Sequence, residues 1–472
     1  MEEEKKKILI VGAGVAGREL LGQIRKGLKS VYEIVGFADD DPKKLGKKIG
    51  GIKVLGAVNA LPWIIRKNKV DEVFIAIPSG EGKTIRKVVD KCRKIRVNFK
   101  IIPRLLEIVE GKVKLQQVRE VKVEDVLGRA ILKSKQTVFK DGFRGKRILV
   151  TGAAGSIGSE ICRQLVSFRP ELVVALDWSE NGLYDLELEL GEKGAKIKYI
   201  VANASDYPKM AKTVSYYKPD VVFHAAAYKH VPLMQIFPEE AVRNNIFATE
   251  VVARVVKENK VKKFVLLSTD KAVDPTSVMG ATKLIAEKII RSHNGGATKF
   301  CAVRFGNVFG SVGSVVPTFK KQIARGGPLT VTDKRMVRFF MSIPEAVRLV
   351  LHASLLAKGG EIFVLDMGDQ FKIDELARLM IRLAGFVPDK EIKIKYVGVR
   401  PGEKMSEELF SKKDKIAKTS VERIFKVKNG REKGISDHDL EALRAAVAEG
   451  KRKRVFGILK SFAPNLKNLE SI

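Results

Sequence analysis

Residues 145–165 read GKRILVTGAAGSIGSEICRQL, and this stretch decides the fold of the longer part of the chain. The apolar run Arg147–Val150 is typical of a buried parallel strand, and a helical pattern begins soon after it. Between the two, Gly152, Gly155 and Gly158 follow a GxxGxxG spacing. Such glycines permit a tight turn and let the backbone approach a pyrophosphate, which then lies at the helix N-terminus. The stretch therefore predicts a dinucleotide-binding strand–turn–helix unit.

An acidic residue follows at the spacing that a dinucleotide requires. The strand pattern LVVALD ends at Asp177, about twenty residues beyond the glycines. A carboxylate in this place binds the ribose diol and disfavours a 2′-phosphate, so we expect NAD; the lysine-rich neighbourhood keeps NADP as the alternative. The other residues expected at the cofactor belong to the glycine turn and to the loops after the following strands: Ser156, Ile157, Ser179, Asn181, Asn203, Ala204, Ala225, Ala226 and Ala227.

A second glycine fingerprint, KILIVGAGVAGRELL, occupies residues 7–21. Gly12, Gly14 and Gly17 again separate a strand pattern from a helical one, and the next strand pattern ends at Asp39. No catalytic pattern follows this fingerprint. Two interpretations of this fingerprint therefore carry comparable weight: a nucleotide-binding turn, and a turn that only packs a helix on a sheet and binds no nucleotide.

Strand patterns alternate with helical patterns along the chain, which indicates β-α-β units and parallel sheets. We predict an α/β protein with two Rossmann-type doubly wound parallel-sheet domains, residues 1–130 and residues 131–472. The second domain is expected to include a smaller C-terminal substrate-binding subdomain, largely from residue 307 onward. Residues 139–145 are predicted to form a turn or linker.

Composition narrows the class of protein. Of the 472 residues 45% are hydrophobic, yet no run of about twenty apolar residues could span a membrane. Three cysteines without a CxxC pair indicate neither a zinc site nor a disulfide framework, so we expect no metal and a cytoplasmic location. The net charge of +33 is spread along the chain and favours a lysine-rich solvated surface, with peripheral contact to the inner membrane face as the alternative. No nucleic-acid-binding motif is present, and nucleic acid is not expected as a partner.

The chemistry is expected in residues 268–288, which read STDKAVDPTSVMGATKLIAEK. Because this stretch follows the apolar run Lys263–Leu267, Asp270 and Lys271 stand at the carboxyl end of a parallel strand, where open α/β sheets bind ligands. Lys283 lies on the helix that follows. A carboxylate and two lysines thus converge and can serve as acid, base and electrostatic clamp.

Seven ordered motifs between residues 145 and 408 resemble the extended short-chain dehydrogenase/reductase superfamily. Within it they are similar to the CapD-like nucleotide-sugar dehydratases of polysaccharide biosynthesis, of the UDP-N-acetylglucosamine 4,6-dehydratase type. The motifs are TGAAGSIGSEI, HAAAYKHVPLM, NNIFATE, STDKAVDPTSVMGATKL, RFGNVFGSVGSVVP, the PLTVTD and RFFMS pair, and RPGEK. Residues 7 to about 103 resemble the CoA-binding-like Rossmann domain of the long branch of that family, and the membrane helices that usually precede this domain are missing from the sequence.

One departure from the superfamily is informative. The superfamily uses a YxxxK pair with tyrosine as the base, whereas Met279 stands at the tyrosine position, four residues before Lys283. A thioether cannot take a proton. The long branch is similar in this respect, so the match narrows the interpretation. We expect a water held by Lys283 and Thr269 to receive the proton of the sugar hydroxyl.

The resemblance implies an enzyme that removes water from a UDP-sugar and keeps its NAD. Lys271 is then expected as the base at C5 and Asp270 as the acid at the C6 hydroxyl. Thr269 would hydrogen-bond the C4 oxygen, and Lys283 the nicotinamide ribose. A homo-oligomer is expected, because related enzymes associate. The residues expected at the UDP-sugar are Lys229, His230, Asn307, Thr330, Thr332, Arg338, Arg400 and Glu403.

Two other functions stay open. A UDP-sugar 4-epimerase would share the fold and the first hydride transfer but would return the hydride to C4. The Asp270–Lys271 pair beside a missing tyrosine argues against it. A non-catalytic Rossmann regulator that senses a nucleotide is the second alternative. The ligand of the N-terminal domain is open among CoA, a nucleotide and none.

Overall fold

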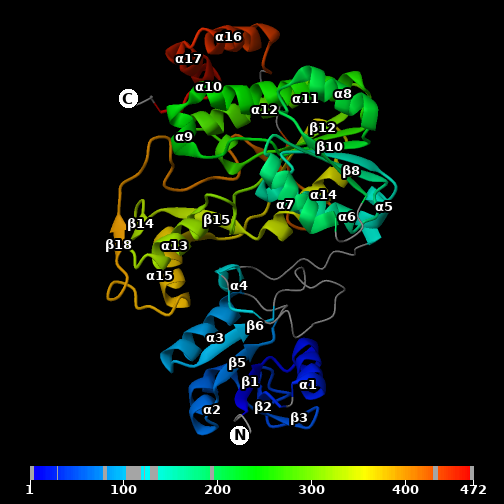
Figure 1. Ribbon diagram of the computed structural model, residues 1–472. Helices are drawn as coiled ribbons and strands as arrows, with labels where there is room; N and C mark the ends of the chain where they lie inside the picture. The colour runs from blue at the N-terminus through cyan, green and yellow to red at the C-terminus, as the bar shows by residue number, and fades with distance from the viewer. Residues whose placement is uncertain are drawn as a thin grey trace. The chain divides into compact units, whose positions relative to one another are not determined.

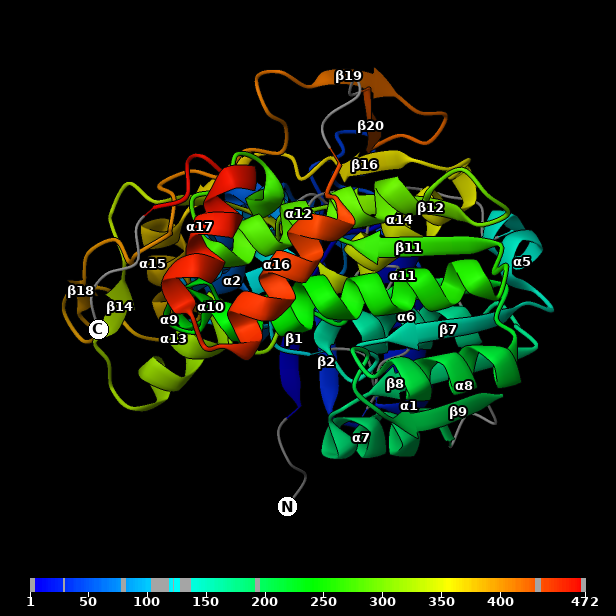
Figure 2. The same ribbon diagram turned by 90° about the horizontal axis from the view of Figure 1, so that it is seen from above.

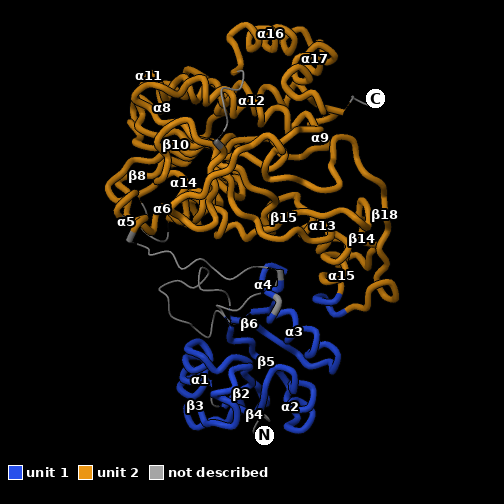
Figure 3. The backbone as a smooth tube through the Cα atoms, turned by 180° about the vertical axis from the view of Figure 1, so that it is seen from behind, with its two compact units in different colours: residues 1–133, 382–385 blue, residues 134–381, 386–472 orange. Residues whose placement is uncertain are grey.

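The computed structural model describes residues 5–28, 30–77, 82–102, 119–121, 123–127, 137–191, 196–428 and 434–467. The chain divides into two compact units, residues 1–133 with 382–385 and the remainder (Figures 1 and 3). The predicted boundary between residues 130 and 131 lies outside the described residues.

The second unit is built on a nine-stranded sheet with the order β19-β20-β16-β12-β11-β10-β7-β8-β9. The strands from β16 to β9 are all parallel, and β20 and β19 extend this edge in antiparallel fashion. The chain order reverses between β7 and β10, and in open α/β sheets a ligand crevice forms at such a switch point. The strands are β7 (Arg147–Thr151), β8 (Leu172–Asp177), β9 (Ile197–Val201), β10 (Val221–His224), β11 (Lys263–Leu267), β12 (Lys299–Arg304), β16 (Glu361–Leu365), β19 (Lys415–Lys418) and β20 (Ile424–Lys428).

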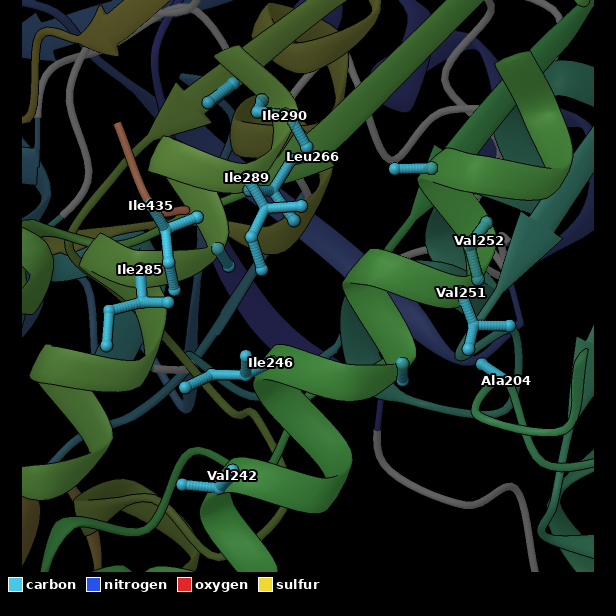
Figure 4. Close-up of a cluster of buried hydrophobic side chains, with 14 of the residues drawn as sticks. Ala204, Val242, Ile246, Val251, Val252, Leu266, Ile285, Ile289, Ile290 and Ile435 are labelled. Atoms are coloured by element: carbon cyan, nitrogen blue, oxygen red, sulfur yellow. The ribbon is translucent and has the colours of Figure 1, made fainter. Parts of the chain in front are cut away.

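Helices cover both faces of this sheet, which is why its strands read as continuous apolar runs (Figure 2). One face carries α8 (Tyr207–Tyr217), α11 (Ala248–Glu258) and α12 (Val278–His293). Their buried residues form one hydrophobic core with alternate strand residues such as Leu266. In Figure 4 the side chains of Ile285 and Ile289 on α12 lie in this core, together with Leu266. The helices α6 (Ser156–Val166), α7 (Glu180–Gly191) and α14 (Ile343–Leu356) pack on the remaining strand positions.

Most of the segment predicted as a turn or linker at residues 139–145 is instead helical, because α5 spans Thr137–Phe143, and only residues 144–145 form a turn. Phe139 and Phe143 stand one turn apart, are buried, and both stack on Phe168. A methyl group on Gly142 would come within 2.5 Å of the Leu355 side chain, so glycine allows a close approach to α14. The burial of two aromatic rings outweighs the low helix propensity of the glycine.

Smaller elements lie beyond the main sheet. β13 (Asn307–Val308), β15 (Val337–Met341) and β17 (Gln370–Lys372) form one small sheet, and β14 (Leu329–Val331) pairs with β18 (Ile394–Tyr396). The terminal helices α16 (Asp437–Ala448) and α17 (Arg452–Phe462) return to the core, where α17 packs on α12. In the parts of the chain that the structure describes, no helix is both long and apolar enough to cross a bilayer.

The first unit contains a six-stranded sheet with the order β3-β4-β2-β1-β5-β6, in which only the β3–β4 pairing is antiparallel among the described strands. Helix α1 packs on it through Leu20, Leu21 and Ile24. Both units therefore confirm the predicted doubly wound α/β architecture. The elements are β1 (Lys6–Val11), α1 (Val15–Gly27), β2 (Tyr32–Ala38), β3 (Lys48–Ile49), β4 (Ile52–Gly56), α2 (Leu61–Lys67), β5 (Glu72–Ile75), α3 (Gly82–Lys94) and β6 (Asn98–Ile101).

The three cysteines are all buried and free, one in the first unit and two in the second. Burial raises the pKa of each thiol, of Cys92, Cys162 and Cys301 alike, to about 12. The thiolate, which is the reactive form, is therefore scarce at neutral pH.

The first glycine turn yields a test of the packing in unit 1. A methyl group on Gly17 would lie 2.0 Å from the Gly12 carbonyl oxygen, whereas one on Gly14 meets nothing within 4 Å. We expect Gly17→Ala to lower the free energy of unfolding by roughly 1–3 kcal/mol, because β1 and α1 must separate. Gly14→Ala should cost less than about 1 kcal/mol. Urea unfolding measures the loss of stability in each variant, and hydrogen exchange at the β1 amides shows whether the loss arises at this strand. Equal losses in the two variants would contradict the close packing of Gly17 against Gly12.

Candidate functional site

A cavity of about 800 Å³ opens in the second unit at the carboxyl ends of β7, β8, β10 and β11. It is lined by the glycine turn after β7, the end of β8, the small-residue loop after β10, the end of β11 and the loop that follows β12. The position is the switch point of the sheet order, and it lies at the carboxyl ends of the parallel strands, where a ligand was expected.

The glycine turn forms a cradle of bare backbone. Gly152 has a φ of +69°, and a methyl group on it would lie 2.5 Å from the Ala226 amide nitrogen. A methyl group on Gly158 would lie 2.0 Å from the Gly152 carbonyl oxygen. The turn therefore cannot be built with side chains at these positions. It leaves the first turn of α6 exposed to the cavity, a geometry that fits the pyrophosphate of a dinucleotide.

Asp177 is fixed at the end of β8 by backbone amides. Its Oδ2 accepts a hydrogen bond from the Ala154 amide at 2.9 Å and its Oδ1 from the Ser179 amide at 2.9 Å. Each oxygen keeps a second lone pair for a ribose hydroxyl. Trp178, 64% exposed, lines the cavity beside it, and the sequence analysis did not single it out. These residues fit a dinucleotide with a free ribose diol.

The predicted cofactor residues all line the cavity except Asn181, which is exposed on α7 and does not contribute to the lining. The predicted residues that line it are Gly152, Gly155, Ser156, Ile157, Gly158, Asp177, Ser179, Asn203, Ala204, Ala225, Ala226, Ala227 and Lys283.

The small-residue loop after β10 is held by Asn245. This side chain accepts from the Tyr228 amide at 2.8 Å and donates to the Tyr228 carbonyl at 3.0 Å and to Thr282 Oγ1 at 3.0 Å. Asn245 lies in a π-helical turn, Val242–Phe247, ahead of α11. Such turns are frequent at functional sites. The signal in the sequence was the NNIFATE motif, which was noted without a role for its asparagines.

Thr269, Asp270 and Lys271 form a hydrogen-bonded cluster just beyond β11. Asp270 Oδ1 accepts from Thr269 Oγ1 at 2.8 Å and from Lys271 Nζ at 2.9 Å. Lys271 Nζ also donates to Asn307 Oδ1 at 3.0 Å. Thr269, Lys271 and Asn307 line the cavity, whereas Asp270 is fully buried behind them. Asp270 therefore accepts hydrogen bonds from both Thr269 and Lys271, and these two residues connect it to the cavity.

Met279 and Lys283 face the same cavity from α12. Lys283 is 4% exposed, and burial lowers the pKa of its ammonium group to about 8, against a smaller opposing effect of Glu287. On the neighbouring strand His224 is buried between Thr151 and Thr249, and burial lowers the pKa of its imidazole to about 3. The histidine is therefore neutral at physiological pH.

A buried ionic network supports the strand ends below the cavity. Glu287 on α12 accepts a hydrogen bond from Ser268 Oγ and a forked pair from Arg304 at 2.9 and 2.7 Å. Arg304 in turn lies 3.6 Å from Asp414 Oδ2. The network ties β11, α12 and β12 together, and so fixes the residues on either side of it.

The predicted substrate residues divide into two groups. Lys229, His230 and Asn307 line the cavity, and burial lowers the pKa of both Lys229 and His230. The other five do not line it. Thr330 accepts a hydrogen bond from Gln322, and Arg338 donates to backbone carbonyls. Thr332 is half-buried and Arg400 is exposed. Glu403 lines a separate hollow of about 650 Å³.

The sequence matches known families in both units. Residues 148–429 match the family described as polysaccharide biosynthesis protein, and residues 1–103 match a CoA-binding domain. The chain belongs to the polysaccharide biosynthesis protein family. The resemblance that the seven motifs indicated is thereby confirmed.

Three curated proteins illustrate what this chain is similar to. The chain is 43% identical over 431 residues to the capsular polysaccharide biosynthesis protein CapD of Staphylococcus aureus, which covers 90% of this chain and 72% of CapD. It is 36% identical over 291 residues to a UDP-N-acetylglucosamine 4,6-dehydratase (inverting) of Campylobacter jejuni, covering 60% and 83%. It is 34% identical over 284 residues to a UDP-glucose 4-epimerase of Rickettsia canadensis, covering 58% and 80%. The relatives support an enzyme.

Among solved structures, Pen from Bacillus thuringiensis is similar with 34% identity and a TM-score of 0.56, covering 65% of this chain and 98% of Pen. The likeness supports the α/β fold described above.

Lys283 yields a test that couples stability to pH. The pKa of Lys283 in the folded protein lies below that of a free lysine. The charged ammonium therefore destabilises the folded protein most below about pH 8. This destabilisation fades as the pH rises toward about 10.4, the pKa of a free lysine. We expect Lys283→Met to raise the free energy of unfolding of the NAD-free protein at pH 7 by up to about 3 kcal/mol. The gain should vanish above about pH 10. Denaturant unfolding across this pH range measures it.

The matched control is Lys257→Met, at an exposed lysine of α11. It should change stability by no more than about 0.5 kcal/mol at any pH. A Lys283→Met protein that is less stable than wild type at pH 7 would contradict the buried ammonium.

Proposed function

We propose that the protein is a nucleotide-sugar 4,6-dehydratase that uses bound NAD to convert UDP-N-acetylglucosamine, or a close UDP-hexose, to its 4-keto-6-deoxy form for surface polysaccharide or glycan synthesis. The observation that carries the proposal is the Lys271 amine. It lines the same cavity as the glycine cradle and is bonded to Asp270 and Asn307, while the tyrosine position is Met279. An amine with a carboxyl partner suits elimination next to a temporary carbonyl.

NAD, when bound, supplies the hydride acceptor for C4 and returns that hydride to C6. The other steps belong to the chain. Lys283 and Thr269 hold the water that receives the hydroxyl proton of C4. Lys271 takes the proton from C5, and Asp270, as the acid, protonates the C6 oxygen, which leaves as water. Once the hydride has reached C6, Lys271 returns a proton to C5. The cluster holds these groups by hydrogen bonds of 2.8 and 2.9 Å.

The two ends of the substrate make different demands. Lys229 and His230 line the cavity near the sugar chemistry and can bind hydroxyl or phosphate oxygens. The residues still predicted to contact the UDP part of the substrate are Thr330, Thr332, Arg338, Arg400 and Glu403. The same proposal includes NAD rather than NADP as the cofactor and a homo-oligomeric state. It also includes a cytoplasmic location with contact to the inner membrane face.

A UDP-sugar 4-epimerase is the second candidate, because epimerases are relatives of the same region. Such an enzyme returns the hydride to C4 and leaves the C5 proton in place. The Lys271–Asp270 cluster would then have no bond to break at C5 or C6. For this reason the dehydratase is preferred.

The reaction is tested by incubating the full chain with UDP-N-acetylglucosamine and NAD⁺ in heavy water. Dehydration removes the mass of one water and leaves deuterium at C5, which mass spectrometry detects. An epimerised sugar of unchanged mass would support the second candidate. A chain that binds NAD and converts neither this sugar nor other UDP-hexoses would contradict both.

Variants of the cluster test the roles. Asp270→Asn and Lys271→Ala should each lower the rate of dehydration at least about 100-fold, as expected for the loss of a general acid or base. Lys257→Ala, at the exposed lysine on α11, is the matched control and should keep the wild-type rate. Wild-type turnover in both cluster variants would remove the roles assigned here.

A further inference from the structure

Trp178 is a large aromatic side chain that the steps above leave unused. It directly follows Asp177 at the end of β8, lines the cavity and is 64% exposed. Among the described residues, no ring stacks on its indole and no hydrogen bond reaches it. The other tryptophan of the chain, Trp63, is also exposed, but the Lys67 ammonium lies 4.6 Å from the centre of its ring. An open aromatic face inside a cavity is typical of a site that a ligand covers.

The backbone on both sides of Trp178 is fixed. The Ser179 amide donates to Asp177 Oδ1 at 2.9 Å, and the Gly182 amide donates to Ser179 Oγ at 3.3 Å. A methyl group on Gly182 would lie 2.7 Å from Ala154 Cβ, so the start of α7 packs closely on the glycine turn. The loop is therefore held by its neighbours, whereas the indole is not. A fixed backbone lowers the entropy that the ring would lose on stacking against a ligand.

The cavity around the indole contains no cation. Strands β8 and β9 lie on one side of β7 in the sheet, and β10 and β11 lie on the other. The glycine turn, the end of β8 and residues 202–204 after β9 line the first side with one acid, Asp177, and no basic residue. The basic residues that line the cavity come instead from the loops after β10 and β11 and from α12, and they are Lys229, His230, Lys271 and Lys283.

This distribution of charge favours one dinucleotide over the other. An acid at the end of the second strand binds the adenosine ribose, so the adenine ring attached to that ribose comes to lie near the residue beside the acid, Trp178. A phosphate monoester on the ribose carries close to two negative charges at pH 7. Next to Asp177 it would meet a carboxylate and an indole, and no cation of the lining would balance it. A charge that is left unbalanced is a means of rejecting the wrong ligand.

We propose that Trp178 determines the binding and the choice of the cofactor: its indole stacks on the adenine ring of NAD, and with Asp177 it excludes the 2′-phosphate of NADP. The inference rests on the proposed use of NAD and names the residue that makes the choice. Both parts of the proposal are tested on the full chain freed of nucleotide.

Fluorescence tests the stacking, because the chain contains two tryptophans and each can be observed alone. In Trp63→Phe the indole emission comes from Trp178, and NAD⁺ and AMP should each quench it to saturation. UDP-N-acetylglucosamine alone should leave this emission unchanged. In Trp178→Phe the quench should be lost. An emission of Trp178 that NAD⁺ does not change at saturation, or that responds to the UDP-sugar and not to AMP, overturns the proposal.

Calorimetric titration gives the loss of affinity. Trp178→Ala should bind NAD⁺ about 5- to 150-fold more weakly than wild type, as expected for the loss of one base–aromatic stack, whereas Trp178→Phe keeps a ring and should lose less than about fivefold. Tyr184→Ala is the matched control, since Tyr184 is an exposed aromatic residue of α7 that does not line the cavity. It should bind NAD⁺ as wild type does. Wild-type affinity in Trp178→Ala overturns the stacking.

The same titrations with NADP⁺ test the choice of cofactor. Wild type should bind NADP⁺ at least about 100-fold more weakly than NAD⁺, because the phosphate faces a carboxylate without a counterion. Trp178→Arg supplies a cation at this place and should narrow the ratio at least about tenfold. Equal affinity of wild type for the two dinucleotides, or an unchanged ratio in Trp178→Arg, overturns the role in selection.

These readouts separate the inference from the proposed function, because they measure binding and need no turnover. If no UDP-sugar is dehydrated and the affinities behave as expected, the role of Trp178 stands and the dehydratase fails. If the sugar is dehydrated and Trp178→Ala binds NAD⁺ as tightly as wild type, the dehydratase stands and the role of Trp178 fails. Melting curves confirm that the variants compared are folded, as expected for changes at an exposed side chain.

Discussion

The Glu287 carboxylate lies inside the core of the larger unit and receives hydrogen bonds from Ser268 and Arg304. Ser268 directly precedes the Thr269–Lys271 cluster, and Glu287 stands one turn after Lys283 on α12. One buried acid thus links the end of β11, which leads into Lys271, to the helix that carries Met279. Removing one partner would leave a charge without compensation in the interior, which is why such networks specify geometry more than they add stability.

A second constraint is steric. The carbonyl oxygen of Gly152 sits where a side chain at position 158 would be, and α6 is therefore pressed against the turn. The first unit repeats this arrangement with Gly12 and Gly17. In each unit an acid at the end of the second strand accepts from a loop amide, Asp39 from Ala13 and Asp177 from Ala154. The shared backbone arrangement explains why both units are Rossmann-type.

Much of this was accessible from the sequence, because its signals are local. Glycine spacing and apolar strand patterns placed the cradle, Asp177 and the Lys271 cluster at the ends of parallel strands, and parallel strand ends meet at one sheet edge. What the sequence could not supply depends on contacts between distant segments. The helix α5 forms because Phe139 and Phe143 find Phe168, and Asn245 acquires a role through a π-helical turn that no spacing revealed. Arg338 was expected at phosphate and is held by carbonyls of a segment 66 residues further on.

The three cysteines have a practical consequence. Because Cys92, Cys162 and Cys301 are buried and their thiols rarely ionise, the natural protein should resist alkylating reagents and air oxidation in its folded form. A single cysteine placed on an exposed helix would then be the chief reactive thiol of the native chain. Fluorophores and spin labels could be attached there without first deleting any residue from the core.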